Sequence, residues 1–153
     1  MDFVSLFISP EGRINRATYW IGSLSVLAVE LALRLGLGVP FTPTPSDSLS
    51  LRALSFVIDL VLLYPAAMVM VKRLHDINQS GSLVGWLVVP NVVLMITNLL
   101  GMTGDPDRMA VLETIFLLGT SVVVLTFLVV LGFRRGSEGN NQYGPDPLKR
   151  RAS

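Results

Sequence analysis

The chain has no cysteine and little charge, and both shortages limit what it can be. Of its 153 residues, 15% are charged and 51% are hydrophobic, and the mean hydropathy is +0.60. A soluble domain carries roughly 25% charged residues, so this chain has too few polar side chains to cover a globule in water. The absence of cysteine excludes a disulfide framework, a thiolate metal site and a thiol nucleophile. The composition therefore predicts a membrane protein.

An excess of charge of one sign is also missing, and histidine is scarce. The chain has 12 Lys and Arg against 11 Asp and Glu, whereas a nucleic-acid-binding protein carries a basic excess. We therefore expect no nucleic-acid partner. The single histidine, His75, has only scattered carboxylates as co-ligands, so the sequence indicates no metal site. No phosphate-binding or dinucleotide fingerprint is present, and we expect no cofactor.

What the chain does have is four long apolar runs. The bilayer core is about 30 Å thick and a helix rises about 1.5 Å per residue, so a span needs roughly 20 apolar residues. Runs of this length far exceed the usual strand of about 4 to 8 residues. We predict an all-α integral membrane protein formed by one domain of four transmembrane helices. The predicted spans are residues 18–39, 51–71, 83–100 and 112–133, and residues 136–153 form an irregular tail.

The basic residues predict which side of the membrane holds the termini. Flanking Lys and Arg are kept in the cytoplasm, and in a four-span chain both termini lie on the same side. Nine basic residues fall on that side and two on the other, while Arg34 lies within the first span. We expect both termini in the cytoplasm. Asp2 and the charges inside the first run argue against a cleaved signal peptide, so we expect the first span to be retained.

Three polar segments fall on the predicted cytoplasmic face. They are GRINRATYW at residues 12–20, KRLHDINQSG at residues 72–81 and NQYGPDP at residues 141–147. Forked arginine donors pair with acceptors in a partly dry interface, and Gly and Pro in the third segment predict a rigid turn. We expect the segments to assemble into one cluster with a binding or structural role. The expected donors are Arg13, Arg16 and Arg73, the expected acceptors are Asp76, Asp146 and the amide oxygens of Asn15 and Asn141, and His75 and Tyr143 are further members.

In these three ordered segments the chain resembles the bacterial membrane family called domain of unknown function 805. Together with the hydrophobic spans between them, the segments cover nearly the whole chain. One departure is visible, because the family usually places a Trp directly after the Ser-Gly pair, whereas here Ser82 follows Gly81 and the nearest Trp is Trp86. The resemblance implies a small multi-span protein of the bacterial inner membrane. It implies no reaction, substrate or cofactor.

Three charged residues lie well inside the predicted spans, away from their ends, where such groups are costly and often functional. Glu30 and Arg34 are four residues apart on one helix face and can pair. Glu30 and Asp59 each lie about 12 residues, or roughly 18 Å, from the cytoplasmic end of their spans, so two carboxylates can share one guanidinium. This arrangement fits a static polar clamp between two helices. It fits the passage of protons or cations equally well.

Three classes of function stay open. The leading interpretation is a non-enzymatic scaffold or interaction protein of the inner membrane, whose cluster binds anionic lipid headgroups or another membrane protein. The alternative is a small transporter or channel component that uses Glu30, Arg34 and Asp59, and that needs a homo-oligomer to enclose a pathway. The third is a membrane enzyme that uses His75 and Asp76, the one candidate acid–base pair, without any accompanying hydrolase or protease motif.

Overall fold

The computed structural model describes residues 3–102 and 110–149, with side chains at residues 4–102 and 114–149. Of the basic residues used to predict the topology, Arg108, Arg150 and Arg151 lie outside the described residues. The described chain has no strand and contains one isolated bridge, between Asn141 and Gly144. Its elements are α1 (Phe3–Ile8), α2 (Arg16–Leu37), α3 (Leu49–Asp76), the 3-10 helix η1 (Gly81–Val84), α4 (Gly85–Leu99) and α5 (Ala110–Phe133).

Four helical segments are long and apolar enough to cross a membrane. They are Arg16–Leu37, Leu49–Asp76, Gly81–Leu99 and Thr114–Phe133. Large apolar side chains such as Leu35, Val122 and Leu125 are exposed on their outer faces, as expected for helices surrounded by lipid. The prediction of an all-α protein with four helices able to span a membrane is confirmed.

Local signals explain where α2 begins and where α3 ends. Asn15 caps α2, because its side-chain oxygen accepts the backbone N–H of Thr18 at 2.9 Å. The helix α3 continues beyond its apolar run through Lys72–Asp76, up to the left-handed backbone of Asn78 at φ 58°. The first half of the central motif is therefore the end of a helix, which extends five residues beyond the predicted span of residues 51–71.

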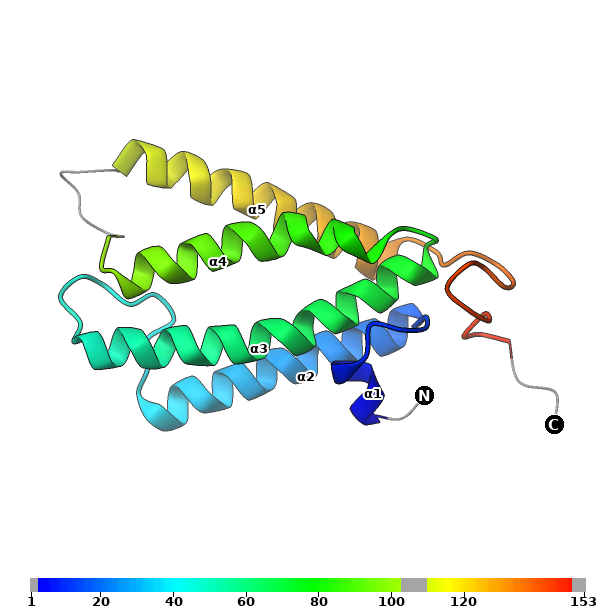
Figure 1. The fold of residues 1–153 in the computed structure, drawn as a ribbon, viewed down its shortest axis with the longest axis horizontal. Coiled ribbons are helices and arrows are strands. Elements are labelled where there is room, and N and C mark those ends of the chain that lie inside the picture. Colours follow the sequence, from blue (N-terminus) through cyan, green and yellow to red (C-terminus); the bar gives the residue numbers. More distant parts are fainter. Residues whose placement is uncertain (1–2, 103–109, 150–153) are drawn as a thin grey trace.

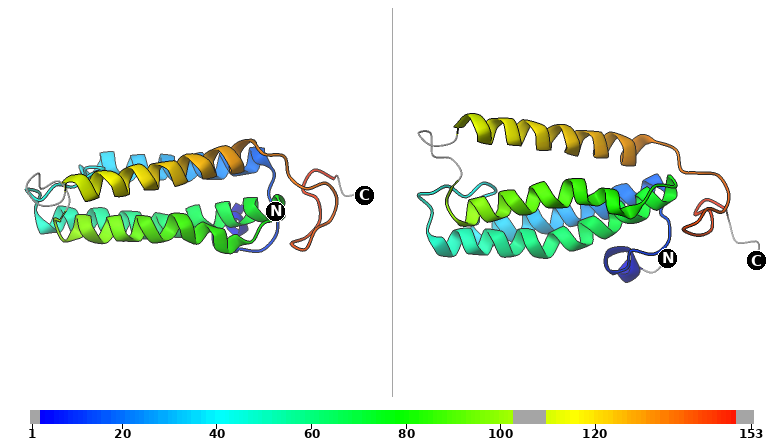
Figure 2. Two further views of the ribbon diagram at one scale, coloured as in Figure 1. Left: turned by 90° about the horizontal axis from the view of Figure 1, so that it is seen from above. Right: turned by 45° about the horizontal axis from the view of Figure 1, so that its top comes forward.

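The central helix of the bundle is α3. It packs against α1, α2, η1 and α4, while α5 packs mainly against α2 and α4. Seen from above in Figure 2, α2 and α5 form one layer and α3 and α4 the other. At Gly22 a Cβ atom would lie 3.0 Å from Cγ2 of Val69, so this glycine lets α2 approach α3 closely.

The buried apolar core lies at one end of the bundle, which we call the motif end. Figure 1 shows that α1 and the tail after α5 also lie at this end. Two side chains of α3 hold α1 in place, because Lys72 donates to the carbonyl oxygen of Ser5 and Tyr64 to that of Ile8. The core residues are Leu6, Ile14, Tyr19, Ala67, Val69, Leu74, Ile77, Val84 and Leu131.

Candidate functional site

At the motif end, one carboxylate holds two buried arginines. Asp76 is 3% exposed, and Arg13 and Arg73 are 4% and 0% exposed. Arg13 donates to Oδ1 of Asp76 from Nη2 at 3.1 Å and from Nε at 3.3 Å, and Arg73 donates to Oδ2 from Nη1. The first two motifs therefore meet at one ion-pair group. Since one carboxylate cannot accept from every guanidinium donor, the remaining donors need other acceptors.

Arg13 uses its remaining donors to hold the tail. Its Nη1 donates to the carbonyl oxygens of Gly139 at 2.7 Å and Gly144 at 3.2 Å, and its Nη2 donates to that of Ser137 at 2.6 Å. Gly139 and Gly144 have φ values of 72° and 134°, which favour glycine. The backbone N–H of Ser137 also donates to the carbonyl oxygen of Asp76 at 2.8 Å. The tail is thus fixed to the helices by side-chain and backbone bonds.

Arg73 uses its remaining donors to cap α5. Its Nε donates to the carbonyl oxygen of Leu131 at 2.7 Å, and its Nη2 donates to that of Arg134. The last carbonyl groups of a helix have no partner within the helix, and a cation there also complements the helix dipole. Just beyond, Gly136 lies so close to the carboxylate of Asp76 that a Cβ atom would collide with it. Arg73 and Asp76 therefore join the ends of α3 and α5.

His75, directly before Asp76 in α3, brings all three motifs together. Its ring stacks on Tyr143, with ring centres 3.9 Å apart and planes inclined by 4°. Its Nδ1 lies 3.2 Å from the carbonyl oxygen of Gly12, and its own carbonyl oxygen accepts Nδ2 of Asn141 at 2.9 Å. His75 and Asp76, the candidate acid–base pair, thus have separate partners, and each is engaged in packing the motifs.

The other three predicted acceptors have partners that differ from those expected. Asn15 caps α2, and the side-chain oxygen of Asn141 accepts the backbone N–H two residues later at 2.9 Å. Asp146 accepts the backbone N–H groups of Leu148 at 2.9 Å and Gly139 at 3.1 Å, and these bonds hold the pKa of Asp146 below its usual value. Short polar side chains commonly bond to nearby backbone. The expectation that these oxygens accept from the arginines is therefore corrected.

Arg16 lies outside the ion-pair group and lines a pocket of about 390 Å³. The pocket lies between the start of α2 and the tail. Its wall also contains Arg135, Glu138 and Asp146, and it borders the ion-pair group through Arg73 and Asp76. Arg16 is exposed and donates to the carbonyl oxygen of Phe133 at 3.4 Å, and Arg135 is exposed as well. Within the described part of the chain, neither arginine has an ion-pair partner.

Three aromatic residues lie close in sequence to these two arginines: Tyr19 and Trp20 in α2, and Phe133 at the end of α5. Trp20 is one turn after Arg16, and its Nε1 donates to the carbonyl oxygen of Gly132 at 3.3 Å. Its ring makes edge contacts with Tyr19 and Phe133, with ring centres 5.7 Å and 5.8 Å apart. Aromatic rings of this kind gather where a membrane protein meets the headgroup layer.

The charged residues inside the spans form a second polar group, far from the motif end. Arg34 is 3% exposed. Its Nε donates to Oε1 of Glu30 at 3.0 Å, and its Nη2 donates to Oδ1 of Asp59. The structure therefore brings together the three residues expected to share one guanidinium, and it joins α2 to α3 through them.

Three further partners of Arg34 were not identified from the sequence. Its Nη1 donates to Oγ of Ser55 at 3.1 Å and to the carbonyl oxygen of Pro40 at 2.6 Å. The ring of Phe41 lies 4.9 Å from the guanidinium, a distance that allows cation–π attraction. Ser55 lies one turn before Asp59, so helical spacing could have identified it. The other two depend on how the chain folds back after α2.

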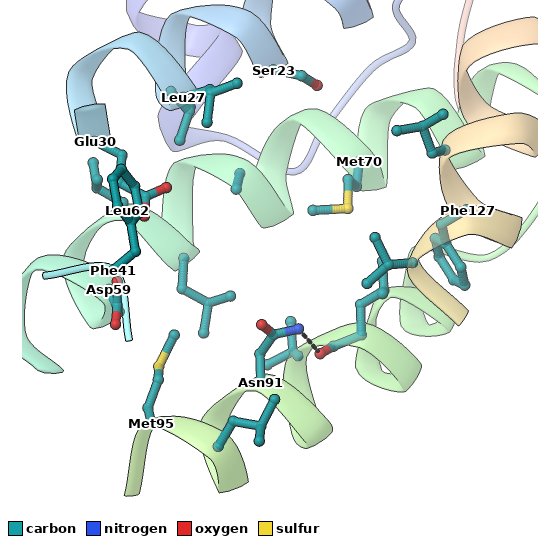
Figure 3. A pocket seen from close by; sticks show the side chains of 18 of the residues that line it. Ser23, Leu27, Glu30, Phe41, Asp59, Leu62, Met70, Asn91, Met95 and Phe127 are labelled. Carbon is teal, nitrogen blue, oxygen red and sulfur yellow. Dashed lines mark hydrogen bonds between the residues drawn. The ribbon is translucent and has the colours of Figure 1, made fainter. Parts of the chain in front are cut away.

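A cavity of about 580 Å³ extends from this group between α2, α3, α4 and α5. Figure 3 shows Glu30, Phe41 and Asp59 at one end, while Met70 and Phe127 lie further along. Most of the lining is apolar. Among the residues with described side chains, no group of three or more His, Cys, Asp or Glu residues could hold a metal ion.

Comparison with known proteins places the chain among bacterial relatives. The model of the family described as "Protein of unknown function (DUF805)" matches residues 7–145. The uncharacterized protein YiiR of Escherichia coli K12 is 29% identical over 151 residues, which cover 95% of this chain and 90% of YiiR. The protein of the same name from Escherichia coli O157:H7 gives the same values. No solved structure matches the chain.

Proposed function

The chain belongs to the DUF805 family of proteins of unknown function, and on that premise we propose that it is a non-enzymatic inner-membrane protein that binds anionic lipid headgroups at its motif end. The motif end and both termini face the cytoplasm in this proposal. The excess of Lys and Arg beside that end supports this orientation.

The ion-pair group around Asp76 acts as a structural lock in this proposal. The guanidinium groups of Arg13 and Arg73 are buried and donate to Asp76 and to backbone carbonyl groups. A ligand could bind them only by displacing these bonds, which would leave charges buried without a partner. The lock therefore holds the tail and the end of α5 in place. Arg73 and Asp76 form part of the pocket wall, but their hydrogen bonds are already used, so Arg16 and Arg135 provide the donors for the ligand.

The observation that carries the proposal is the presence in the neighbouring pocket of two arginines that have no ion-pair partner among the described residues. Arg16 and Arg135 line a pocket of about 390 Å³ beside the aromatic rings of Tyr19, Trp20 and Phe133. This location corresponds to the headgroup layer of a membrane. Guanidinium groups bind phosphate through paired hydrogen bonds, so the pocket offers donors at the level where lipid phosphates lie.

The same wall also offers acceptors, which favours a headgroup that carries hydroxyl groups as well as phosphate. Glu138 and Asp146 contribute carboxylates to the pocket. A carboxylate repels a second anion but accepts a hydrogen bond from a hydroxyl group. Phosphatidylglycerol has both chemical groups, and it is the ligand that we take as the test case.

The experiment compares lipid retention by native mass spectrometry after extraction from nanodiscs of phosphatidylglycerol or phosphatidylcholine. Each arginine near an anionic surface contributes about 1 kcal/mol, so the double variant Arg16→Gln with Arg135→Gln should bind phosphatidylglycerol about 30-fold more weakly. Arg134→Gln is the matched control, because Arg134 is exposed next to Arg135 but does not line this pocket. Equal losses in the control and the double variant would reject the pocket.

A further inference from the structure

The cavity between the four long helices contains one more negative than positive side chain. Glu30 and Arg34 come from α2 and Asp59 comes from α3, and among the residues with described side chains these three are the charged ones in its lining. Within the described part of the chain, α4 contributes the neutral Asn91 and otherwise apolar side chains, and α5 contributes apolar side chains. Arg34 can neutralise one carboxylate, so the second needs a positive charge or a proton.

The size and the walls of the cavity indicate which class of cation fits it. Its volume of about 580 Å³ lies within the range of roughly 300 to 1,000 Å³ that is typical of small-molecule sites. Beyond the charged end the walls are formed by residues such as Leu62, Met70, Met95 and Phe127. A bare metal ion prefers several oxygen ligands, whereas apolar walls favour an organic body.

We propose that this cavity binds a lipophilic organic cation, with its positive charge beside Glu30 and Asp59 and its apolar body along α3, α4 and α5. The cation supplies the charge that Arg34 leaves unmatched. In the empty cavity a proton on one of the two carboxylates fulfils that role, and it leaves for the solvent when the cation binds. The site shares no residue with the lipid-headgroup pocket at the motif end, so it does not depend on the proposed function.

Among the residues with described side chains, the charged groups that face the exchanged proton belong to two helices. They are Glu30 and Arg34 on α2 and Asp59 on α3, and Tyr19 is the remaining titratable residue of the lining, toward the motif end of α2. Because the cation and a proton compete for the same excess carboxylate, the affinity for the cation should rise as the pH rises. A purely hydrophobic site would bind with an affinity independent of pH.

The test uses the full chain in detergent and two probes of nearly the same shape and opposite charge. Tetraphenylphosphonium is a lipophilic cation, and tetraphenylborate is its anionic counterpart. Equilibrium dialysis should show saturable binding of one phosphonium per chain and at least about tenfold weaker binding of the borate, since the cavity has no unpaired cation. Equal affinity for the two probes would overturn the proposal.

Two isosteric variants locate the charge. Glu30→Gln and Asp59→Asn each remove the excess carboxylate and leave Arg34 with one acidic partner, so each should fold and bind phosphonium at least about tenfold more weakly. Asp47→Asn is the matched control, because Asp47 lies in the loop after α2 and does not line the cavity. Undiminished binding in either folded cavity variant would overturn the proposal.

A third variant tests the volume and keeps the charges. Ala66 lines the cavity, and Ala66→Phe should lower phosphonium binding by filling the space along α3. The lipid-binding variant Arg16→Gln with Arg135→Gln should leave phosphonium binding unchanged. If Arg16→Gln with Arg135→Gln fails to retain lipid but binds phosphonium normally, the lipid site and the cation site are independent.

Discussion

Replacing Asp76 by Asn should destabilise the protein more than the loss of any exposed carboxylate, because Asp76 is the shared anion of two buried arginines. One oxygen accepts from Arg13 and the other from Arg73. In Asp76→Asn one of these oxygens becomes an NH₂ group that faces guanidinium donors. The amide also removes the negative charge from a group in which all three residues are at most 4% exposed.

The expected magnitude follows from the burial of the two cations. Removing one partner of a buried ion pair costs about 3 to 5 kcal/mol. For a chain of this length, each 1 kcal/mol lowers Tm by about 2 to 4 °C, so Tm should fall by about 6 to 20 °C. The tail should also loosen, because Arg13 holds Ser137, Gly139 and Gly144 through the same guanidinium that Asp76 orients.

Two assays on detergent-purified protein check this result. The fluorescence of Trp20, whose indole N–H bonds to α5, reports thermal unfolding, and trypsin cleavage after Arg135 reports release of the tail. Glu138→Gln is the control, because Glu138 is an exposed carboxylate of the same tail and its loss should cost under about 0.5 kcal/mol. Combining Asp76→Asn with Arg13→Gln should be milder than the sum of the single changes. A Tm of Asp76→Asn within about 2 °C of the parent, with an unchanged cleavage rate, would refute this reasoning.

Three further predictions concern topology, the clamp in the spans and pH. Reporter fusions after Ser46 should be located outside the cytoplasm and those after Asn78 inside, and the reverse pattern would contradict the proposed orientation. Arg34→Leu leaves two carboxylates without a cation and should reduce folded yield more than Arg34→Leu combined with Glu30→Gln, as measured by size-exclusion chromatography. Backbone N–H groups hold the pKa of Asp146 below its ordinary value of 3.8, so its stabilisation of the tail is fully present above that pH and is lost as the pH falls below it. Lowering the pH through this range should therefore increase proteolysis of the tail. In Asp146→Asn, the part of this increase that comes from Asp146 should be absent.

The helices could be predicted from the sequence because the signal is long and simple. Residues 115–133 contain no charged side chain, and an apolar run of this length fits a helix across a bilayer far better than a strand. The end of α3 could not be located in the same way. Its apolar run ends at Val71, but the helix continues because the polar side chains after it are held by other parts of the chain, as in the bond from Lys72 to Ser5.

The pairing within the motifs was only partly predictable, because donors and acceptors can be recognised in a sequence but their partners cannot. Nearby backbone N–H groups donate to the side-chain oxygens of Asn15, Asn141 and Asp146. These oxygens therefore do not accept from the arginines, because the local backbone donors compete for them. Ser137 lies outside all three motifs, yet it accepts from Arg13. The cavity was also not predictable, since its volume depends on side chains of four helices that do not fill the space between them.

The two polar groups balance charge in opposite ways, and this difference supports a purely structural role for the ion-pair group at the motif end and a ligand-binding role for the group in the cavity. At the motif end two cations share one anion, and backbone carbonyl groups take the remaining donors, so the group is closed. In the cavity two anions share one cation, and both carboxylates line open space. The resemblance to the family rests on the three motifs, which build the lock, whereas Glu30, Arg34 and Asp59 lie outside them. We therefore expect a relative that keeps the motifs but has neutral residues at these three positions to keep the fold and to lack the proposed cation site.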